Sequence, residues 1–217
     1  VNSVPMPVLV FFIVFICGMI SSVITAIVTS LFLVEIVNVM PMERANRINL
    51  VILACFSIGL GAVLTPLGEP LSTIAITKLQ GPPYHATFWY LFDQLGVLII
   101  LGCAICSAFA AFYCGRAGKA EVKELVEEGG LREVIVRAVK VYVFVFALFL
   151  LGDGMNVLID KYFTHIPSMV LYWVNIVSAI LDNATLTAAE LSPAMSQLQI
   201  NAALMGLLIF GGCLIPG

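Results

Sequence analysis

The sequence predicts an all-α membrane protein built from inverted repeats, each a re-entrant hairpin followed by a discontinuous transmembrane helix. The first observation behind this prediction is composition, since 61% of the 217 residues are hydrophobic and only 11% are charged. Soluble domains carry about 25% charged residues, so this composition indicates a polytopic membrane protein. The second observation is that polar residues, prolines and glycines interrupt the apolar runs. The third is that these interruptions occur twice, with the flanking charges arranged in opposite order.

The first apolar run spans residues 8–39, and its only charged residue is Glu35. A membrane core about 30 Å thick needs roughly 20 helical residues, so this run is longer than one crossing requires. Its middle is rich in small and hydroxyl residues, among them Ser22 and Thr25, which suit the tip of a re-entrant hairpin over about residues 8–40. A single long tilted helix, with its serines and threonines packed against a neighbour, is the alternative.

A helix-breaking segment, residues 65–70 with the sequence TPLGEP, separates the apolar run 48–64 from the run 71–79. Two prolines and a glycine end a helix, and the second run is too short to cross a membrane by itself. We therefore expect one crossing by a broken helix over residues 48–79. Unwound backbone at membrane depth is tolerated only where it is buried in protein or lines a cavity. The hairpin and this broken helix form a first repeat, residues 1–79.

Residues 80–167 are predicted to connect the two repeats. A conventional span with aromatic residues at both ends is followed by an amphipathic loop, residues 114–140, which holds six of the ten lysines and arginines. The positive-inside rule places this loop in the cytoplasm. The next span carries Asp153 between two glycines, about two thirds of the way along. This carboxyl group is a candidate proton-relay residue.

The second repeat is predicted over residues 168–217. Its hairpin, about residues 168–191, carries an aspartate and an asparagine in the middle of apolar sequence. An ionised carboxylate at bilayer depth costs about 3 kcal/mol or more, and such residues usually line an ion or substrate path. A broken helix is expected from about residue 198, and it ends on the same Gly-x-x-x-x-Pro pattern at Gly211 that the first repeat has at Gly61. Because the sequence lacks an initiator methionine and stops within this pattern, we expect both ends to be truncated.

The flanking charges predict that the two repeats enter the membrane from opposite faces. Counted back from the cytoplasmic loop, the first broken helix begins inside, at Arg44 and Arg47. Counted forward, the second hairpin returns outside, where residues 192–199 contain no basic side chain. Inverted repeats whose broken helices meet near the midplane are the architecture of secondary transporters.

Two motifs resemble those of the ion transporter superfamily, which includes arsenite permeases and D-type sodium/proton antiporters. Ser178-Ala-Ile-Leu-Asp182-Asn183 is similar to the hairpin motif of that superfamily, and residues 61–70 (GAVLTPLGEP) are similar to its helix break. The sequence is most similar to an uncharacterised prokaryotic family described as cation transporters. The resemblance implies an ion site at the hairpin tips, a homodimer and the inner membrane of a prokaryotic cell.

The sequence departs from the superfamily pattern in three respects, one of which is that only one span, not several, separates the cytoplasmic loop from the second hairpin. Glu69 stands where those relatives often carry asparagine, and the first hairpin has Thr25-Ala26 where the second has Asp182-Asn183. The first half-site therefore carries no carboxylate in its hairpin. We expect one ion site centred on the second hairpin, supported by a mostly neutral partner half.

The expected function is sodium/proton antiport by alternating access. A hard cation takes oxygen ligands, and Asp182 and Asn183 are the expected sodium ligands. Sodium would bind the ionised form of Asp182, and protonation would release it on the other side. The complete set of expected binding residues, from both hairpins and the helix break, is Ser22, Thr25, Thr65, Gly68, Glu69, Ser178, Asp182, Asn183 and Thr185. We expect Na⁺ and H⁺ as transported ions, the lipid bilayer and a second copy as partners, and no cofactor, nucleic acid or enzymatic activity.

Other interpretations remain open. Asp182 and Asn183 can cap a buried helix, and Glu69 can cap the half-helix that follows it. A sodium-coupled symporter for a dicarboxylate, sulfate or arsenite is an alternative, since helix N-termini favour anions, although no basic residue lies near the predicted tips. An intramembrane aspartyl protease with Asp153 and Asp182 as its catalytic pair is a distant alternative. Glu35 and Glu190 are expected near the hairpin bases, in reach of water.

Overall fold

The computed structural model describes residues 5–114, 165–178 and 183–211, with scattered residues between 136 and 162. Within these described residues the regular elements are all helices. Three of them are long and apolar enough to cross a membrane: α1 (Met6–Ile24), α3 (Arg44–Ala62) and α5 (Tyr90–Cys114). The prediction of an all-helical chain is confirmed for this part, and the three long helices are compatible with a membrane protein.

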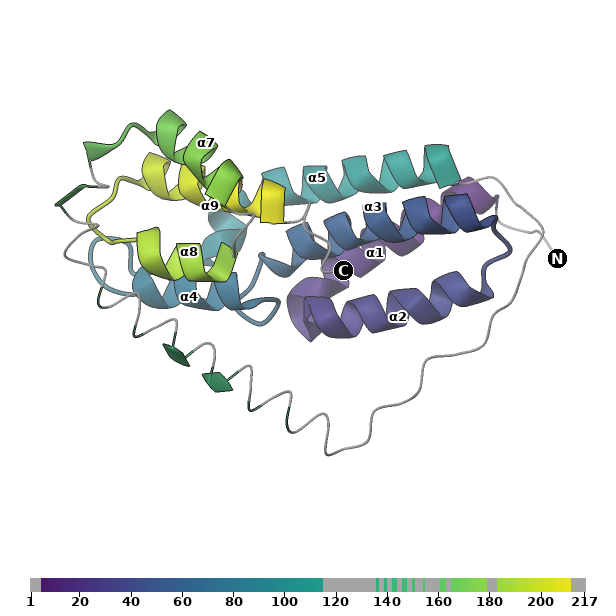
Figure 1. Cartoon of the computed structure of the whole chain (residues 1–217), viewed down its shortest axis with the longest axis horizontal. Coiled ribbons are helices and arrows are strands. Elements are labelled where there is room, and N and C mark those ends of the chain that lie inside the picture. Colours follow the sequence, from purple (N-terminus) through teal and green to yellow (C-terminus); the bar gives the residue numbers. More distant parts are fainter. Residues whose placement is uncertain are drawn as a thin grey trace.

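The first apolar run forms two helices, because the chain turns back at Thr25. Helix α1 ends at Ile24 and α2 (Ala26–Val39) begins one residue later. Thr25 has φ 76° and ψ 150°, and its side chain accepts a hydrogen bond from the backbone N–H of Val28 at 3.4 Å. The two helices pack against each other and against α3, as Figure 1 shows. A single long helix is therefore excluded.

The second run is broken between α3 and α4 (Pro70–Lys78). Pro66 has no N–H to continue the helical hydrogen bonds, and a Cβ atom at Gly68 would overlap the carbonyl oxygen of Ala62. Only glycine fits this close return of the chain. Pro70 opens α4, a position where its missing N–H costs nothing. The Thr73 hydroxyl stabilises the break by donating a hydrogen bond to the carbonyl oxygen of Pro66 at 2.6 Å.

Small residues let α1, α3 and α5 approach closely. A Cβ atom at Gly61 would overlap the carbonyl oxygen of Gly18 on α1. Ser21 donates to the carbonyl oxygen of Ile58 at 2.8 Å, and Ser57 donates to that of Val14 at 3.1 Å. Close packing of small residues with hydrogen-bonding hydroxyls is typical of membrane helix interfaces.

The later helices are α7 (Ser168–Ser178), α8 (Asn183–Glu190) and α9 (Gln197–Gly211). Helix α7 packs on α9, and α8 lies beside α4 (Figure 1). Ile74 of α4 is buried against Ala184 and Ala188 of α8. The Lys78 ammonium group donates to the carbonyl oxygen of Leu191 at 2.9 Å, where both helices end. The two half-helices therefore run in the same direction.

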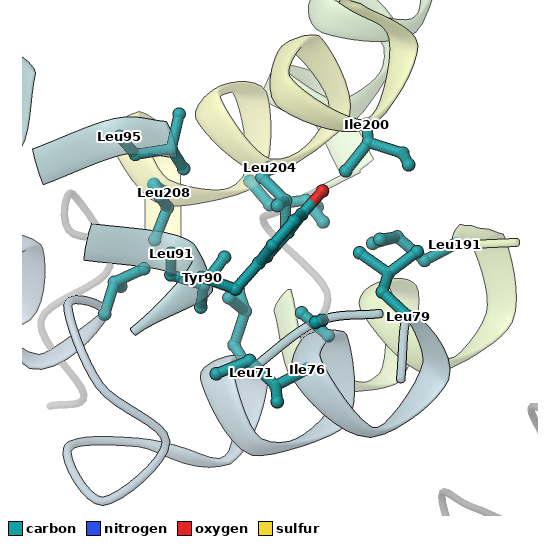
Figure 2. Packing of buried hydrophobic residues seen from close by; sticks show 14 of the residues in the cluster. Leu71, Ile76, Leu79, Tyr90, Leu91, Leu95, Leu191, Ile200, Leu204 and Leu208 are labelled. Carbon is teal, nitrogen blue, oxygen red and sulfur yellow. The ribbon is translucent and has the colours of Figure 1, made fainter. Parts of the chain in front are cut away.

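One hydrophobic cluster joins α4 and the first half of α5 to α7, α9 and the segment between α8 and α9. Figure 2 shows the buried side chains of this cluster meeting around Tyr90. The Tyr90 hydroxyl donates to Gln197 Oε1 at 2.8 Å, and the Tyr84 hydroxyl donates to the carbonyl oxygen of Met195. The labelled members of the cluster are Leu71, Ile76, Leu79, Tyr90, Leu91, Leu95, Leu191, Ile200, Leu204 and Leu208.

Candidate functional site

The turn between α1 and α2 contacts the break between α3 and α4. The backbone N–H of Ala26 donates to the carbonyl oxygen of Gly68 at 3.2 Å. The Thr65 hydroxyl, which is buried, donates to the carbonyl oxygen of Ser22. These two contacts bring together four of the predicted binding residues. Ser22, Thr65 and Gly68 take part in the contacts, and Thr25 precedes Ala26 at the turn. Two interruptions that lie far apart in the sequence thus form one polar locus.

Glu69 is the carboxylate of this locus. Its backbone is extended, with φ −156° and ψ 161°, and its side chain does not cap α4. The Glu69 Oε1 atom is buried and has no hydrogen-bond partner within the part of the chain that the structure describes. A buried, unpaired carboxylate oxygen is costly, so the capping interpretation does not explain this residue. A bound proton or cation would supply the missing interaction.

Ser72 is a neighbouring oxygen that the sequence analysis missed. It is fully buried, and its Oγ atom also lacks a hydrogen-bond partner among the described residues. Residues three positions apart share one face of a helix, so Ser72 lies on the α4 face that begins at Glu69. The sequence signal that could have identified Ser72 is its position three residues after Glu69, directly after the helix break.

The N-termini of neighbouring helices affect the electrostatic field around Glu69. The Ala26–Gly68 contact brings the first residues of α2 close to those of α4. Because α8 lies beside α4 (Figure 1) and runs parallel to it, the two helices begin at the same end of the pair, with Asn183 first in α8 and Pro70 first in α4. The partial positive charge at a helix N-terminus favours a negative group beside it. An ionised Glu69 therefore sits at a favourable position in sequence, directly before α4.

The second half of the predicted site is described in part. Asn183 opens α8, and its carbonyl oxygen accepts a hydrogen bond from the Thr187 hydroxyl at 2.7 Å. Thr185, two residues after Asn183, is half-buried. Ser178 is the last residue of α7. Asp182 and Asp153 lie outside the described residues, as does the predicted second break after Gly211. The protease alternative depends entirely on those two aspartates.

The whole chain, residues 1–217, matches the model of a family described as a protein of unknown function, DUF1646. The chain belongs to this family. The DUF1646 description assigns no activity. No curated protein and no solved structure matches the chain. The function of this DUF1646 member therefore has to be argued from its residues.

Proposed function

We propose that this protein is a secondary active transporter that exchanges sodium for protons by alternating access. The observation that carries the proposal is Glu69, whose buried Oε1 atom has no hydrogen-bond partner among the described residues. This carboxylate lies in a helix break that contacts a helical turn through Gly68 and Thr65. Unwound backbone with oxygen ligands between half-helices is the usual setting of an ion site in transporters.

A repeated arrangement of helices supports the proposal. The same separation in sequence that aligns Ser21 with Ser178 also aligns Ala26, the first residue of α2, with Asn183, the first residue of α8. Helix α1 packs on α3 as α7 packs on α9. In each pair a glycine allows close approach, and a Cβ atom at Gly206 of α9 would lie 2.6 Å from the carbonyl oxygen of Tyr172. Inverted repeats and the resemblance to the ion transporter superfamily would account for this pattern.

In the proposed mechanism, sodium and the proton compete for carboxylates at the break and the second hairpin. Sodium would bind ionised Asp182 with oxygen atoms of Asn183, Thr185 and Ser178. Glu69 would face this site from the first repeat, one carboxylate in each half. Protonation cancels the charge that holds sodium, so the two ions occupy the site in turn.

A sodium-coupled anion symporter is the second candidate, and one observation favours it. The first residues of α2 and α4 come together at the break, and helix N-termini bind anions. However, the segments 22–30, 61–73 and 178–190 contain no lysine or arginine. An anion would meet the Glu69 carboxylate with no basic partner, so we favour the cation.

The test is ion flux in proteoliposomes that contain a pH-sensitive dye. We expect an imposed sodium gradient to move protons in the wild type. Glu69→Gln and Asp182→Asn should each slow this flux roughly tenfold or more, because a lost charge-assisted ligand costs about 1.5–3 kcal/mol. Glu35→Gln is the matched control, since Glu35 is exposed on α2, and it should leave the flux unchanged.

Two results would contradict the antiporter. One is a wild type in which sodium evokes no proton movement, and the other is a Glu69→Gln variant that transports at the wild-type rate. Sodium-dependent uptake of a dicarboxylate or sulfate by the same proteoliposomes would favour the symporter instead.

A further inference from the structure

Helices α7, α8 and α9 enclose a polar pair, Asn175 and Glu190, that the proposed transport site does not use. Asn175 is 0% exposed and Glu190 is 7% exposed. The expectation that Glu190 reaches water is therefore wrong, because the residues that follow it, Leu191 and Ser192, are buried as well. Glu35, by contrast, is exposed on α2.

The pair has more buried hydrogen-bond acceptors than there are donors to satisfy them. The Asn175 amide group donates to the Glu190 carboxyl group, and Asn175 Nδ2 also donates to the carbonyl oxygen of Ala203 at 3.4 Å. The remaining oxygens, Asn175 Oδ1 and Glu190 Oε2, are buried and have no partner among the described residues. A buried polar atom without a hydrogen-bond partner destabilises the folded protein. Both atoms are acceptors, so what is missing is a donor.

We propose that Glu190 is a proton-binding site, with the proton held on Oε2 and donated to Asn175 Oδ1. A proton taken from solvent forms one O–H bond on the carboxylate and breaks no bond in the protein. The amide N–H already donates to the carboxyl group, so the added O–H would close a cyclic acid–amide pair. One proton thus satisfies both unpaired oxygens.

Apart from Lys78, the helices around the pair favour a neutral Glu190. Helices α7 and α9 contain no charged residue, and Tyr172 is their only titratable side chain. From α4, Lys78 approaches this end of α8 and donates to the carbonyl oxygen of Leu191. Glu190 is the last residue of α8, where the negative end of the helix dipole disfavours a carboxylate.

The proton site is distinct from the proposed transport site. Helix α8 has 8 residues, so Glu190 and Asn183 lie at opposite ends of a helix on the order of 10 Å long. Protonation of Glu190 would neutralise a buried group shared by α7, α8 and α9. The bound proton would therefore hold the second helical hairpin together whether or not an ion occupies the site near Asn183.

Infrared spectroscopy of the full chain in lipid nanodiscs tests the proposal directly. At mildly acidic pH, the wild-type spectrum minus the Glu190→Gln spectrum should contain the carbonyl band of a hydrogen-bonded carboxylic acid. Glu190→Gln keeps the shape of the protonated side chain and can pair with Asn175 as an amide, so it should fold. Asn175→Leu should move the band to the frequency of an acid without an acceptor, and Glu35→Gln should leave it in place.

The proposal is overturned if the difference spectrum shows the loss of a carboxylate band, because Glu190 would then be ionised. It is also overturned if added sodium removes the acid band at constant pH, since a cation would then occupy the pair. Neither spectroscopic result depends on ion flux. The test of Glu190 therefore remains valid if the proposed antiport fails.

Discussion

Thr25 illustrates how a single residue shapes the candidate site. Its φ of 76° and ψ of 150° lie in a region that essentially only glycine occupies, and a β-branched residue there stores about 1–3 kcal/mol of strain. The same residue caps α2 through its hydroxyl. A strained threonine at the turn that contacts the helix break is consistent with a role of its hydroxyl or backbone geometry in the proposed ion site.

Substitution at Thr25 separates strain from capping. We expect Thr25→Gly to raise the thermal unfolding midpoint, because relief of strain exceeds the loss of a cap worth about 1 kcal/mol. Thr25→Ala keeps the strain and loses the cap, so it should lower the midpoint. Thermal unfolding in detergent measures both variants, and equal midpoints for the two would contradict the strain argument.

At the scale of helices, the sequence predicted the pattern of elements well and their ends less well. Two prolines and a glycine predicted the break at residues 65–70. In the structure, α3 ends at Ala62 and α4 begins at Pro70. Helix α3 begins at Arg44, before the predicted apolar run, because arginine is a good helix former that an apolar pattern does not include. The Asn175–Glu190 pair could not be predicted from the sequence, because it depends on how three helices pack.

The glycine contact between α1 and α3 gives a prediction at this scale. Gly61→Ala should destabilise the protein by at least about 3 kcal/mol, because the new methyl group would overlap the backbone of Gly18 and separate the helices. Gly96→Ala on α5 is the control, since its Cβ atom would lie 3.5 Å from the Phe92 ring, an ordinary contact. The folded fraction after heating in detergent measures both, and equal losses would contradict the close packing of α1 and α3.

At the scale of the whole molecule, the start of α3 and the segment between α8 and α9 lie at opposite ends of the long axis (Figure 1). The arginines at residues 44 and 47 lie near the first end, and the segment 191–196 at the second contains no basic residue. From the positive-inside rule we predict that the first end faces the cytoplasm.

Cysteine labelling tests that orientation in intact cells. Glu43 and Ser196 are both exposed, and each is replaced by cysteine in a chain whose six native cysteines are removed. A membrane-impermeant maleimide should label Ser196→Cys in intact cells and Glu43→Cys only after permeabilisation. Labelling of both positions from one side would contradict the inverted arrangement.

The pairing of α4 with α8 also constrains how the protein is made. Helix α4 has 9 residues, and helices this short are marginal without a packing partner. The Lys78 bond to Leu191 joins residues 113 positions apart, so the ribosome completes α4 long before it completes α8. During synthesis α4 is therefore complete long before the α8 residues that bury Ile74 exist.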